Sequence, residues 1–335
     1  MQADRIDVHH HLFPPPFVAQ LVQHEHYLAS GVARHWTPEL SLADMDAAGI
    51  ATAFTSITAP GFAFIPADRL VGINRACNDY GAQMARDHRG RFGLFASLPL
   101  PDIDASLREI EYACDVLQAD GIGVLTSYGD RWLGDPAFAP VLDELDRRGA
   151  VLYVHPTVAD CCRNLLPGIA DWVLEFPVDT TRAIASLLFG GTLQRCQRIR
   201  FIFAHVGGIL PLVVEHLVRA AAVDPALAAR VPGGDVRAAL RALHYDTALR
   251  MHAVGLHAAL QLVDPPQLML GTDAPLRRSA DQLAELHSAG LTAEQLHWIE
   301  GHSARRLLPR CCAAPHAGGS HRLGPPLGPP LSPPP

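Results

Sequence analysis

Lysine is absent from this sequence of 335 residues, because each of the 27 residues in its Lys and Arg total is an arginine. The absence excludes enzymes that form a Schiff base through lysine, anchor pyridoxal phosphate on lysine or hold a nucleotide with a Walker-loop lysine. It also excludes lysine as a general base. An enzyme made from this chain takes its chemistry from other side chains.

Clustered positive charge, cysteine motifs and long apolar runs are also missing. The formal net charge is −7 and the arginines form no basic cluster, which argues against nucleic acid as a partner and favours a small molecule. The seven cysteines contain no CxxC pair, and a chain of this length has no need of disulfides. The sequence has neither a signal-peptide run nor an apolar stretch of about 18 residues. We therefore expect a cytoplasmic protein with reduced thiols and no membrane association.

Short apolar segments alternate with helical segments along most of the chain, and hydrophobic residues make up 49% of it. Eight such alternations predict an α/β fold, namely a distorted (β/α)8 barrel of the TIM type. The alternative, an open doubly wound sheet, lacks the GxGxxG fingerprint after its first strand. The predicted strands cover residues 5–11, 52–57, 92–99, 121–128, 151–155, 199–205, 244–248 and 267–273. The predicted helices include residues 42–48, 67–87, 105–117, 138–147, 210–222, 251–263 and 293–308.

Two insertions and a tail depart from this alternation. Residues 13–38 and 157–177 are irregular segments that follow the first and fifth predicted strands, where barrel active sites lie. We expect small helical or loop insertions there. Residues 311–335 are rich in proline and glycine, so we expect a barrel domain over residues 1–310 and a disordered tail after it.

A histidine pair marks the first predicted strand. His9 and His11 are two residues apart, so a strand places both imidazoles on one side and His10 on the other. That geometry suits two bonds to a metal ion, and Asp7 is a candidate to orient a ligand from behind. A surface histidine run or a fragment of a tag is the alternative interpretation.

Polar residues also end several later strands. His155, His205 and Asp273 each follow an apolar run, and Val206-Gly207-Gly208 permits a tight turn after His205. Taken alone, each such residue is more often a hydrogen-bonded core residue than a ligand. Together they converge on one mouth of a barrel, which favours a functional site there. Asp246 ends the seventh strand, where we expect it to hold a positioning residue or the backbone.

These motifs resemble those of the metal-dependent amidohydrolase superfamily, within it the branch of aminocarboxymuconate-semialdehyde decarboxylase. The matching segments follow the expected order from about residue 5 to residue 310 and comprise residues 7–11, 45–50, 154–156, 203–208, 271–273 and 304–310. The sequence also looks like the 6-methylsalicylate decarboxylase type of this branch at residues 36–39, 56–61, 91–99 and 179–183. The resemblance implies a soluble enzyme that forms homodimers.

The resemblance also implies a metal site and an activity. It assigns His9, His11, His155 and Asp273 as ligands of one divalent metal, usually zinc with Mn²⁺ or Fe²⁺ as alternatives, and needs no organic cofactor. His205 becomes the acid/base beside the metal, with Asp273 as a second catalytic residue. The implied reaction is non-oxidative decarboxylation of a hydroxybenzoate, a 6-methylsalicylate-like acid or a related unsaturated acid. Hydrolysis of a lactone, ester or amide remains an alternative, and an inactive binding protein on the same barrel is a second one.

Substrate contacts are expected from loop residues that follow the strands, with aromatic groups for a ring and arginines for a carboxylate. Arg182 has the equal alternative of a structural role, for instance pairing with Asp179, and Trp172 that of ordinary lid packing. The candidates are Phe13, Ser56, Thr58, Tyr128, Trp172, Asp179, Arg182 and Arg250.

The missing lysine narrows the implied site further. Many members of the resembled superfamily hold two metals that a carboxylated lysine on the fourth strand bridges. This chain cannot form that bridge, and its fourth predicted strand offers no replacement carboxylate. We therefore expect a single metal ion.

Overall fold

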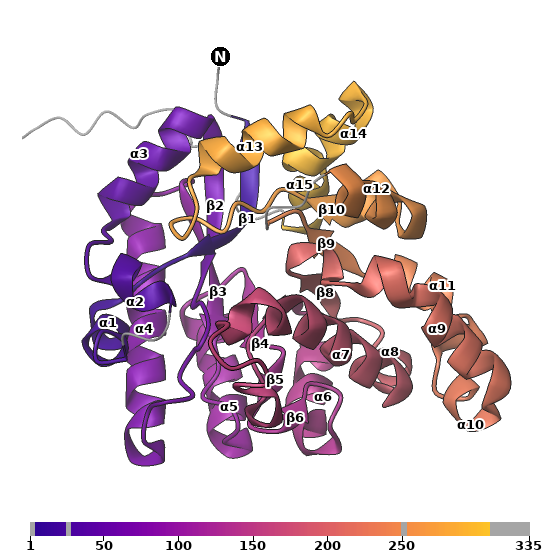
Figure 1. Cartoon of the computed structure of the whole chain (residues 1–335). Helices are drawn as coiled ribbons and strands as arrows, with labels where there is room; N and C mark the ends of the chain where they lie inside the picture. The colour runs from indigo at the N-terminus through magenta and orange to yellow at the C-terminus, as the bar shows by residue number, and fades with distance from the viewer. Residues whose placement is uncertain (1–3, 25–27, 249–252, 309–335) are drawn as a thin grey trace, which may run out of the picture.

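The computed structural model describes residues 4–24, 28–248 and 253–308, and within them eight parallel strands form a nearly closed barrel surrounded by helices (Figure 1). The strand order is β1-β2-β3-β4-β7-β8-β9-β10. Every neighbouring pair in this order is parallel. The predicted (β/α)8 barrel is confirmed, whereas the predicted tail at residues 311–335 lies outside the described residues.

The strands and helices have the following bounds. The barrel strands are β1 (Arg5–His11), β2 (Ile50–Ser56), β3 (Phe92–Ser97), β4 (Gly121–Leu125), β7 (Val151–His155), β8 (Arg200–Phe203), β9 (His244–Asp246) and β10 (Leu268–Met269). The longer helices are α1 (Pro15–Leu21), α2 (Leu28–Ala33), α3 (Pro38–Ala48), α4 (Ala67–Asp87), α5 (Ile103–Glu111), α6 (Ala139–Arg148), α7 (Glu175–Phe189), α9 (Leu210–Val223), α11 (Val236–Arg241), α12 (Ala253–Leu262) and α13 (Ser279–Ser288). Short elements are α8 (Thr192–Arg195), α10 (Pro225–Ala228), α14 (Ala293–His297) and α15 (Ser303–Leu307).

Two of the predicted strands, at residues 5–11 and 151–155, have the observed bounds. The second strand, predicted at residues 52–57, begins two residues earlier and ends one residue earlier. The other five are shorter than predicted, because the chain leaves the sheet before the apolar run ends. The fourth strand ends at Leu125 rather than at residue 128, where a small antiparallel hairpin of β5 (Ser127–Tyr128) and β6 (Arg131–Trp132) follows. The eighth strand covers only Leu268–Met269 of the predicted 267–273.

The barrel closes between its first strand and the segment after its last. Backbone hydrogen bonds run from Val8 N to Leu270 O at 2.9 Å and from Asp273 N to His9 O at 2.9 Å. A further one joins His11 N to Ala274 O at 2.7 Å. This contact, which we call the seam, brings residues from both ends of the described chain into one place.

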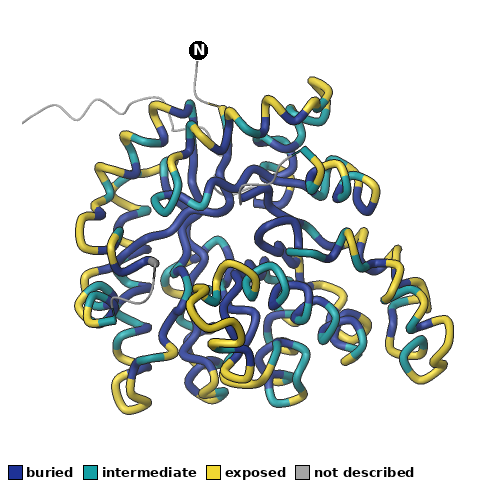
Figure 2. Tube along the Cα trace, in the orientation of Figure 1, coloured by how far each residue is buried: buried dark blue, intermediate teal, exposed yellow. Residues whose placement is uncertain are grey.

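Aromatic rings fill the inside of the barrel below the strand ends. Phe54 stacks on Phe95 with ring centroids 5.4 Å apart, and Phe95 stacks on Tyr153 at 5.2 Å. All three are fully buried, and the tube in Figure 2 is dark blue along the central strands. This packed interior supports the polar groups at the strand ends above it.

The two predicted insertions are present. Helices α1 and α2 lie between β1 and α3, and between β7 and α7 the chain forms only two short turns of 3₁₀ helix at Asp160–Cys162 and Asp171–Val173. Helix α7 was not among the predicted helices. None of the helices in the described residues is both long enough and apolar enough to cross a membrane.

Candidate active site

Strand β1 directs two of its histidines into the barrel mouth. The rings of His9 and His11 are fully buried, with their centroids 4.9 Å apart. His10 points the other way, where Asp7 and the Ser41 hydroxyl bind its ring at 3.1 and 2.9 Å. The predicted alternation along this strand is confirmed.

Four potential metal donors converge above the stacked rings. His9, His11, His155 and Asp273 each offer one donor atom, and these atoms lie within 4.8 Å of one another. His9 Nε2 is 3.1 Å from His11 Nε2, and Asp273 Oδ1 is 3.3 and 3.0 Å from these two nitrogens. The sequence therefore identified a set of residues that the fold does bring together, from β1, the end of β7 and the segment after β10. We call this set the ligand cluster.

The second ring nitrogen of each clustered histidine has its own acceptor. His9 Nδ1 lies 2.9 Å from Asp246 Oδ2, His11 Nδ1 lies 3.2 Å from the Ser56 carbonyl, and His155 Nδ1 lies 2.8 Å from the Pro156 carbonyl. Carbonyl and carboxylate oxygens only accept, so each Nδ1 carries the hydrogen and donates it. In the neutral form of each ring, Nε2 then keeps its lone pair, and this is the tautomer that a metal requires.

This arrangement fits a divalent cation. Lone pairs on neighbouring nitrogens 3.1 Å apart repel one another unless a positive charge lies between them. Burial lowers the pKa of His9, but the carboxylates of Asp246 and Asp273 outweigh burial and raise it to about 10. Burial raises the pKa of Asp273, yet its contacts with His11 and His9 hold that pKa well below its usual value. The field at the ligand cluster thus favours positive charge.

Two carboxylates behind the cluster hold it in place. Asp246 accepts from the Tyr153 hydroxyl at 3.1 Å as well as from His9, and its other oxygen accepts from the backbone of His205 at 3.0 Å. The expected role of Asp246 is confirmed. Asp7 accepts from the backbone N–H groups of His9 and Thr272, both at 3.0 Å, so it positions the chain on either side of the seam.

His205 lies beside the ligand cluster without belonging to it. Its ring centroid is 5.0 Å from that of His9 and 5.8 Å from that of His155. Both of its ring nitrogens are buried and have no hydrogen-bond partner among the residues that the structure describes. Burial, reinforced by His9, lowers the pKa of His205 to about 4. The ring is therefore neutral until an anion such as a carboxylate approaches within about 4–6 Å and raises its pKa again.

A strained backbone turn sets the direction of the His205 side chain. His205 and Val206 both have φ 56°, a left-handed value that is unusual for a side chain branched at Cβ such as valine. Gly208 completes the turn, because a Cβ there would lie 1.9 Å from the Pro177 carbonyl oxygen. Asp273 has φ 63° as well. Strained residues of this kind concentrate at functional sites.

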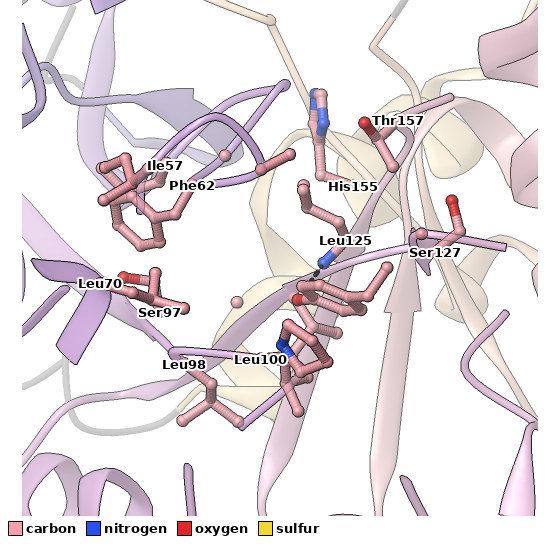
Figure 3. Close-up of a pocket in the computed structure, with 18 of the residues that line it drawn as sticks. Ile57, Phe62, Leu70, Ser97, Leu98, Leu100, Leu125, Ser127, His155 and Thr157 are labelled. Carbon is pink, nitrogen blue, oxygen red and sulfur yellow. Dashed lines mark hydrogen bonds between the residues drawn. The ribbon is translucent and has the colours of Figure 1, made fainter. Parts of the chain in front are cut away.

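A cavity of about 440 Å³ opens next to the ligand cluster. His155 lines it together with Tyr153, Thr157 and Ser127, and it extends toward the loops that follow β2 and β3 (Figure 3). Ser56 also lines this space, and its hydroxyl is buried without a hydrogen-bond partner among the described residues. A ligand in the cavity therefore meets one member of the cluster, His155.

The predicted substrate contacts lie in several places. Ser56 and Tyr128 line the cavity. Phe13 is buried against Phe17 and Trp36, with centroid distances of 6.4 and 6.0 Å. Thr58 is buried, Trp172 is 44% exposed in the insertion after β7, and Arg250 falls outside the described residues.

Asp179 and Arg182 have structural partners. Asp179 accepts hydrogen bonds from Thr126, Ser127 and Trp132 at 2.5, 3.0 and 2.6 Å. Arg182 forms its ion pair with Glu175 at 2.9 Å, so the structural alternative for this arginine applies with a different partner than the one expected.

The cavity also has lining residues that the sequence did not single out. Tyr153 sits inside an apolar strand, and only the two-residue alternation toward His155 indicates that it faces inward. Phe62 and Arg163 come from loops without periodicity, so no pattern in the sequence distinguishes them. Leu98 falls within the predicted strand 92–99 but follows the observed end of β3 at Ser97.

The family model described as Amidohydrolase matches residues 6–310. The 6-methylsalicylic acid decarboxylase of Penicillium expansum is 34% identical over 278 residues, which are 81% of this chain and 85% of that protein. The 2-amino-3-carboxymuconate-6-semialdehyde decarboxylase of Dictyostelium discoideum is 26% identical over 242 residues, 72% of this chain and 67% of its own.

Solved structures share the fold. A mutant 5-carboxyvanillate decarboxylase of Novosphingobium aromaticivorans, with bound manganese and 3-methoxy-4-hydroxy-5-nitrobenzoic acid, has a TM-score of 0.82 at 19% sequence identity. The match covers 91% of this chain and 97% of that one. The barrel and its nearly closed form are thus found in a protein of low sequence identity.

Proposed function

The chain belongs to the amidohydrolase family, and from that membership we propose that it removes CO₂ without oxidation from a small aromatic carboxylic acid. The substrate class is a hydroxybenzoate of the 6-methylsalicylate kind or a related unsaturated acid. One observation carries the proposal: His155 belongs to the ligand cluster, lines a cavity of about 440 Å³, and has the ring of His205 at a centroid distance of 5.8 Å. The two relatives named as decarboxylases support the same reaction.

The proposed metal is zinc, with Mn²⁺ or Fe²⁺ as alternatives, and no organic cofactor takes part. Three imidazole nitrogens and one carboxylate oxygen are a donor set that zinc accepts. Imidazole and carboxylate also suit manganese and iron, and the similar carboxyvanillate decarboxylase holds manganese. Elemental analysis of protein purified without chelator should find close to one equivalent of metal. Less than about 0.2 equivalents would contradict a four-ligand site.

In the proposed mechanism, the protein residues bind, orient and protonate. When bound, the divalent cation supplies Lewis-acid chemistry that draws electron density from a substrate oxygen. Asp246 and the carbonyls of Ser56 and Pro156 keep the three ligating rings oriented. The bond between ring carbon and carboxylate breaks, its electron pair stays on the ring carbon, and His205 delivers a proton there from a ring nitrogen. Ser56 and Tyr128, which line the cavity, contact the ring.

Hydrolysis of a lactone, ester or amide is the alternative, because the same donor set can lower the pKa of a water molecule toward about 7. An inactive binding protein is the second alternative. Purified protein with one equivalent of metal should be incubated with hydroxylated and methylated benzoates, muconate-type acids and a lactone panel. Release of CO₂ with the matching mass loss supports the proposal. Cleavage of esters or lactones with no CO₂ from any acid overturns it.

Assembly and location stay predictions. We propose a homodimer in the cytoplasm, with a small carboxylic acid as the partner molecule. Light scattering at several protein concentrations tests the dimer, and fractionation of the source cells tests the location.

A further inference from the structure

The cavity has two chemically different sides. Figure 3 shows His155, Thr157 and Ser127 on one side and Ile57, Phe62, Leu70 and Leu98 on the other. We call the second group, with Leu100, the apolar lobe. Ile57 and Phe62 follow β2, Leu98 and Leu100 follow β3, and Leu70 comes from helix α4.

The polar group within the apolar lobe is already occupied. Ser97 lies beside Leu70 and Leu98, but its hydroxyl donates to Asn78 Oδ1 at 3.1 Å and its N–H donates to the same oxygen at 2.8 Å. Its carbonyl accepts from Asn74 at 3.1 Å and from Asn78 at 2.9 Å. Both hydrogen-bond donors of Ser97 are therefore engaged within the protein, and the side chains around it on this side of the cavity favour hydrocarbon.

The wall between the two sides is backbone at one point. Gly123 lines the cavity from β4, and a Cβ there would meet the Phe95 carbonyl at 3.3 Å and the Ser56 Cβ at 3.5 Å. At this point β4 therefore packs closely against its neighbours and places no side chain between His155 and the apolar lobe.

The size of the cavity exceeds what a simple hydroxybenzoate fills. Its volume is about 440 Å³. Cavities of about 300–1,000 Å³ typically take drug-sized ligands, and a hydroxybenzoate with one methyl group is considerably smaller than those. An acid held at the ligand cluster leaves the apolar lobe to be filled by whatever its ring carries.

We propose that the apolar lobe binds an alkyl chain longer than methyl on the ring of the substrate acid, at the position of the methyl group in 6-methylsalicylate. This inference rests on the proposed function, because the cluster must hold the acid end. Burial of one methylene contributes about 0.8 kcal/mol, which is roughly fourfold in affinity. Affinity should therefore rise with each added carbon until the apolar lobe is full.

The test separates binding from reaction. We would titrate metal-loaded protein calorimetrically with 3-alkyl-2-nitrophenols carrying methyl, ethyl, propyl and pentyl groups, in which a nitro group replaces the carboxylate and no CO₂ can leave. Release of CO₂ from the matching 6-alkylsalicylates is measured separately. The dissociation constant should fall roughly fourfold from methyl to ethyl and again from ethyl to propyl.

The two measurements test binding by the apolar lobe and decarboxylation separately. Rising affinity without release of CO₂ supports the apolar lobe and overturns the reaction. Release of CO₂ with affinity that stays flat or falls along the series supports the reaction and overturns the apolar lobe. If neither is seen, both are overturned.

A pair of variants tests the location. Leu70→Phe places a larger side chain in the apolar lobe and so reduces the space for an alkyl chain. It should lower the ratio of propyl to methyl affinity about tenfold. Leu283→Phe is the matched control, because Leu283 is a similarly buried helical leucine of α13 that does not line the cavity. Its ratio should equal that of the unmodified protein. Leu98→Ala, which enlarges the apolar lobe, should move the best chain length upward. Thermal melts identify any variant that does not fold, and equal ratios in all folded variants overturn the proposal.

Discussion

The two sides of the cavity are built by opposite means. On the side of the ligand cluster, each histidine ring has a second hydrogen-bond partner, and the side chains come from strand ends joined across the seam. On the side of the apolar lobe, loops after β2 and β3 and helix α4 supply hydrocarbon that makes no side-chain hydrogen bonds. The difference indicates that the reaction depends on the orientation of the ligand-cluster side chains, which the strands determine. The choice of substrate depends on the shape of the apolar lobe, which the loops after β2 and β3 and helix α4 determine.

The largest effect is expected from loss of a ligand. His9→Ala or Asp273→Ala should reduce bound metal below about 0.2 equivalents and bring turnover to background, because each removes one of four converging donors. Elemental analysis and an assay of CO₂ release measure the two quantities. His244→Ala, at the opposite end of β9 from Asp246, is the control and should keep its metal. A ligand variant that retains a full equivalent would break the assignment.

Loss of His205 should separate chemistry from metal binding. We expect His205→Ala to keep the metal and to lower kcat about 100- to 10,000-fold, the usual contribution of a positioned acid. KM should change far less, since the cavity and the cluster remain. His205→Gln serves as the size-matched variant. Unchanged turnover in both variants would show that another group moves the proton.

Asp246 should influence metal affinity although it is not one of the four proposed ligands. Asp246→Asn weakens the hydrogen bond that fixes the His9 ring, so metal affinity should fall about 10- to 100-fold, as is typical when the partner of a ligand is lost. Competition with a chelator of known affinity measures this. An affinity equal to that of the unmodified protein would mean that the strand alone orients His9.

A substitution in the apolar lobe should spare the metal. Leu98→Ala removes a leucine that is 2% exposed, and we expect it to lower the free energy of unfolding by about 2 kcal/mol, the low end for a buried leucine because the site already borders a cavity. Metal content should remain at one equivalent. Urea denaturation and elemental analysis on the same samples check both statements, and a loss of metal would contradict the division of the two sides.

The smallest effect concerns Asp179, which supports the wall near Ser127. Burial raises the pKa of Asp179 above its usual 3.8, although Thr126, Trp132, Ser127 and the charge of Arg182 act against this. The folded state therefore binds the proton more tightly than the unfolded state, and the free energy of unfolding falls as the pH rises from 3.8 through the raised pKa. Asp179→Asn should abolish this fall. Parallel pH-dependent unfolding curves for the two proteins would contradict it.

The sequence predicted the barrel and the ligand cluster well, because both depend on periodic patterns. The two-residue repeat of His9 and His11 and the apolar run before His155 determine which side chains face the barrel mouth. It predicted strand ends less well. The chain leaves β8 at Phe203, and His205 lies in a strained turn that the glycines after it allow but do not locate.

Substrate contacts were the least predictable part. Loop side chains such as Phe62 have no periodicity, and Phe62 packs against Phe17 of helix α1, with ring centroids 5.7 Å apart. The partner of Arg182 shows the same limit. Glu175 opens helix α7, which the sequence did not predict, so its ion pair with Arg182 depends on a helix start rather than on a motif.

The seam has a consequence for how the molecule folds. His11 and Asp273 are 262 positions apart in the chain, yet their donor atoms lie 3.0 Å apart. Contacts of such long range are costly in loop-closure entropy. During synthesis the first strand emerges long before the last. The four donors are therefore together only once β1 has joined the segment after β10, and only a closed barrel has the complete ligand cluster.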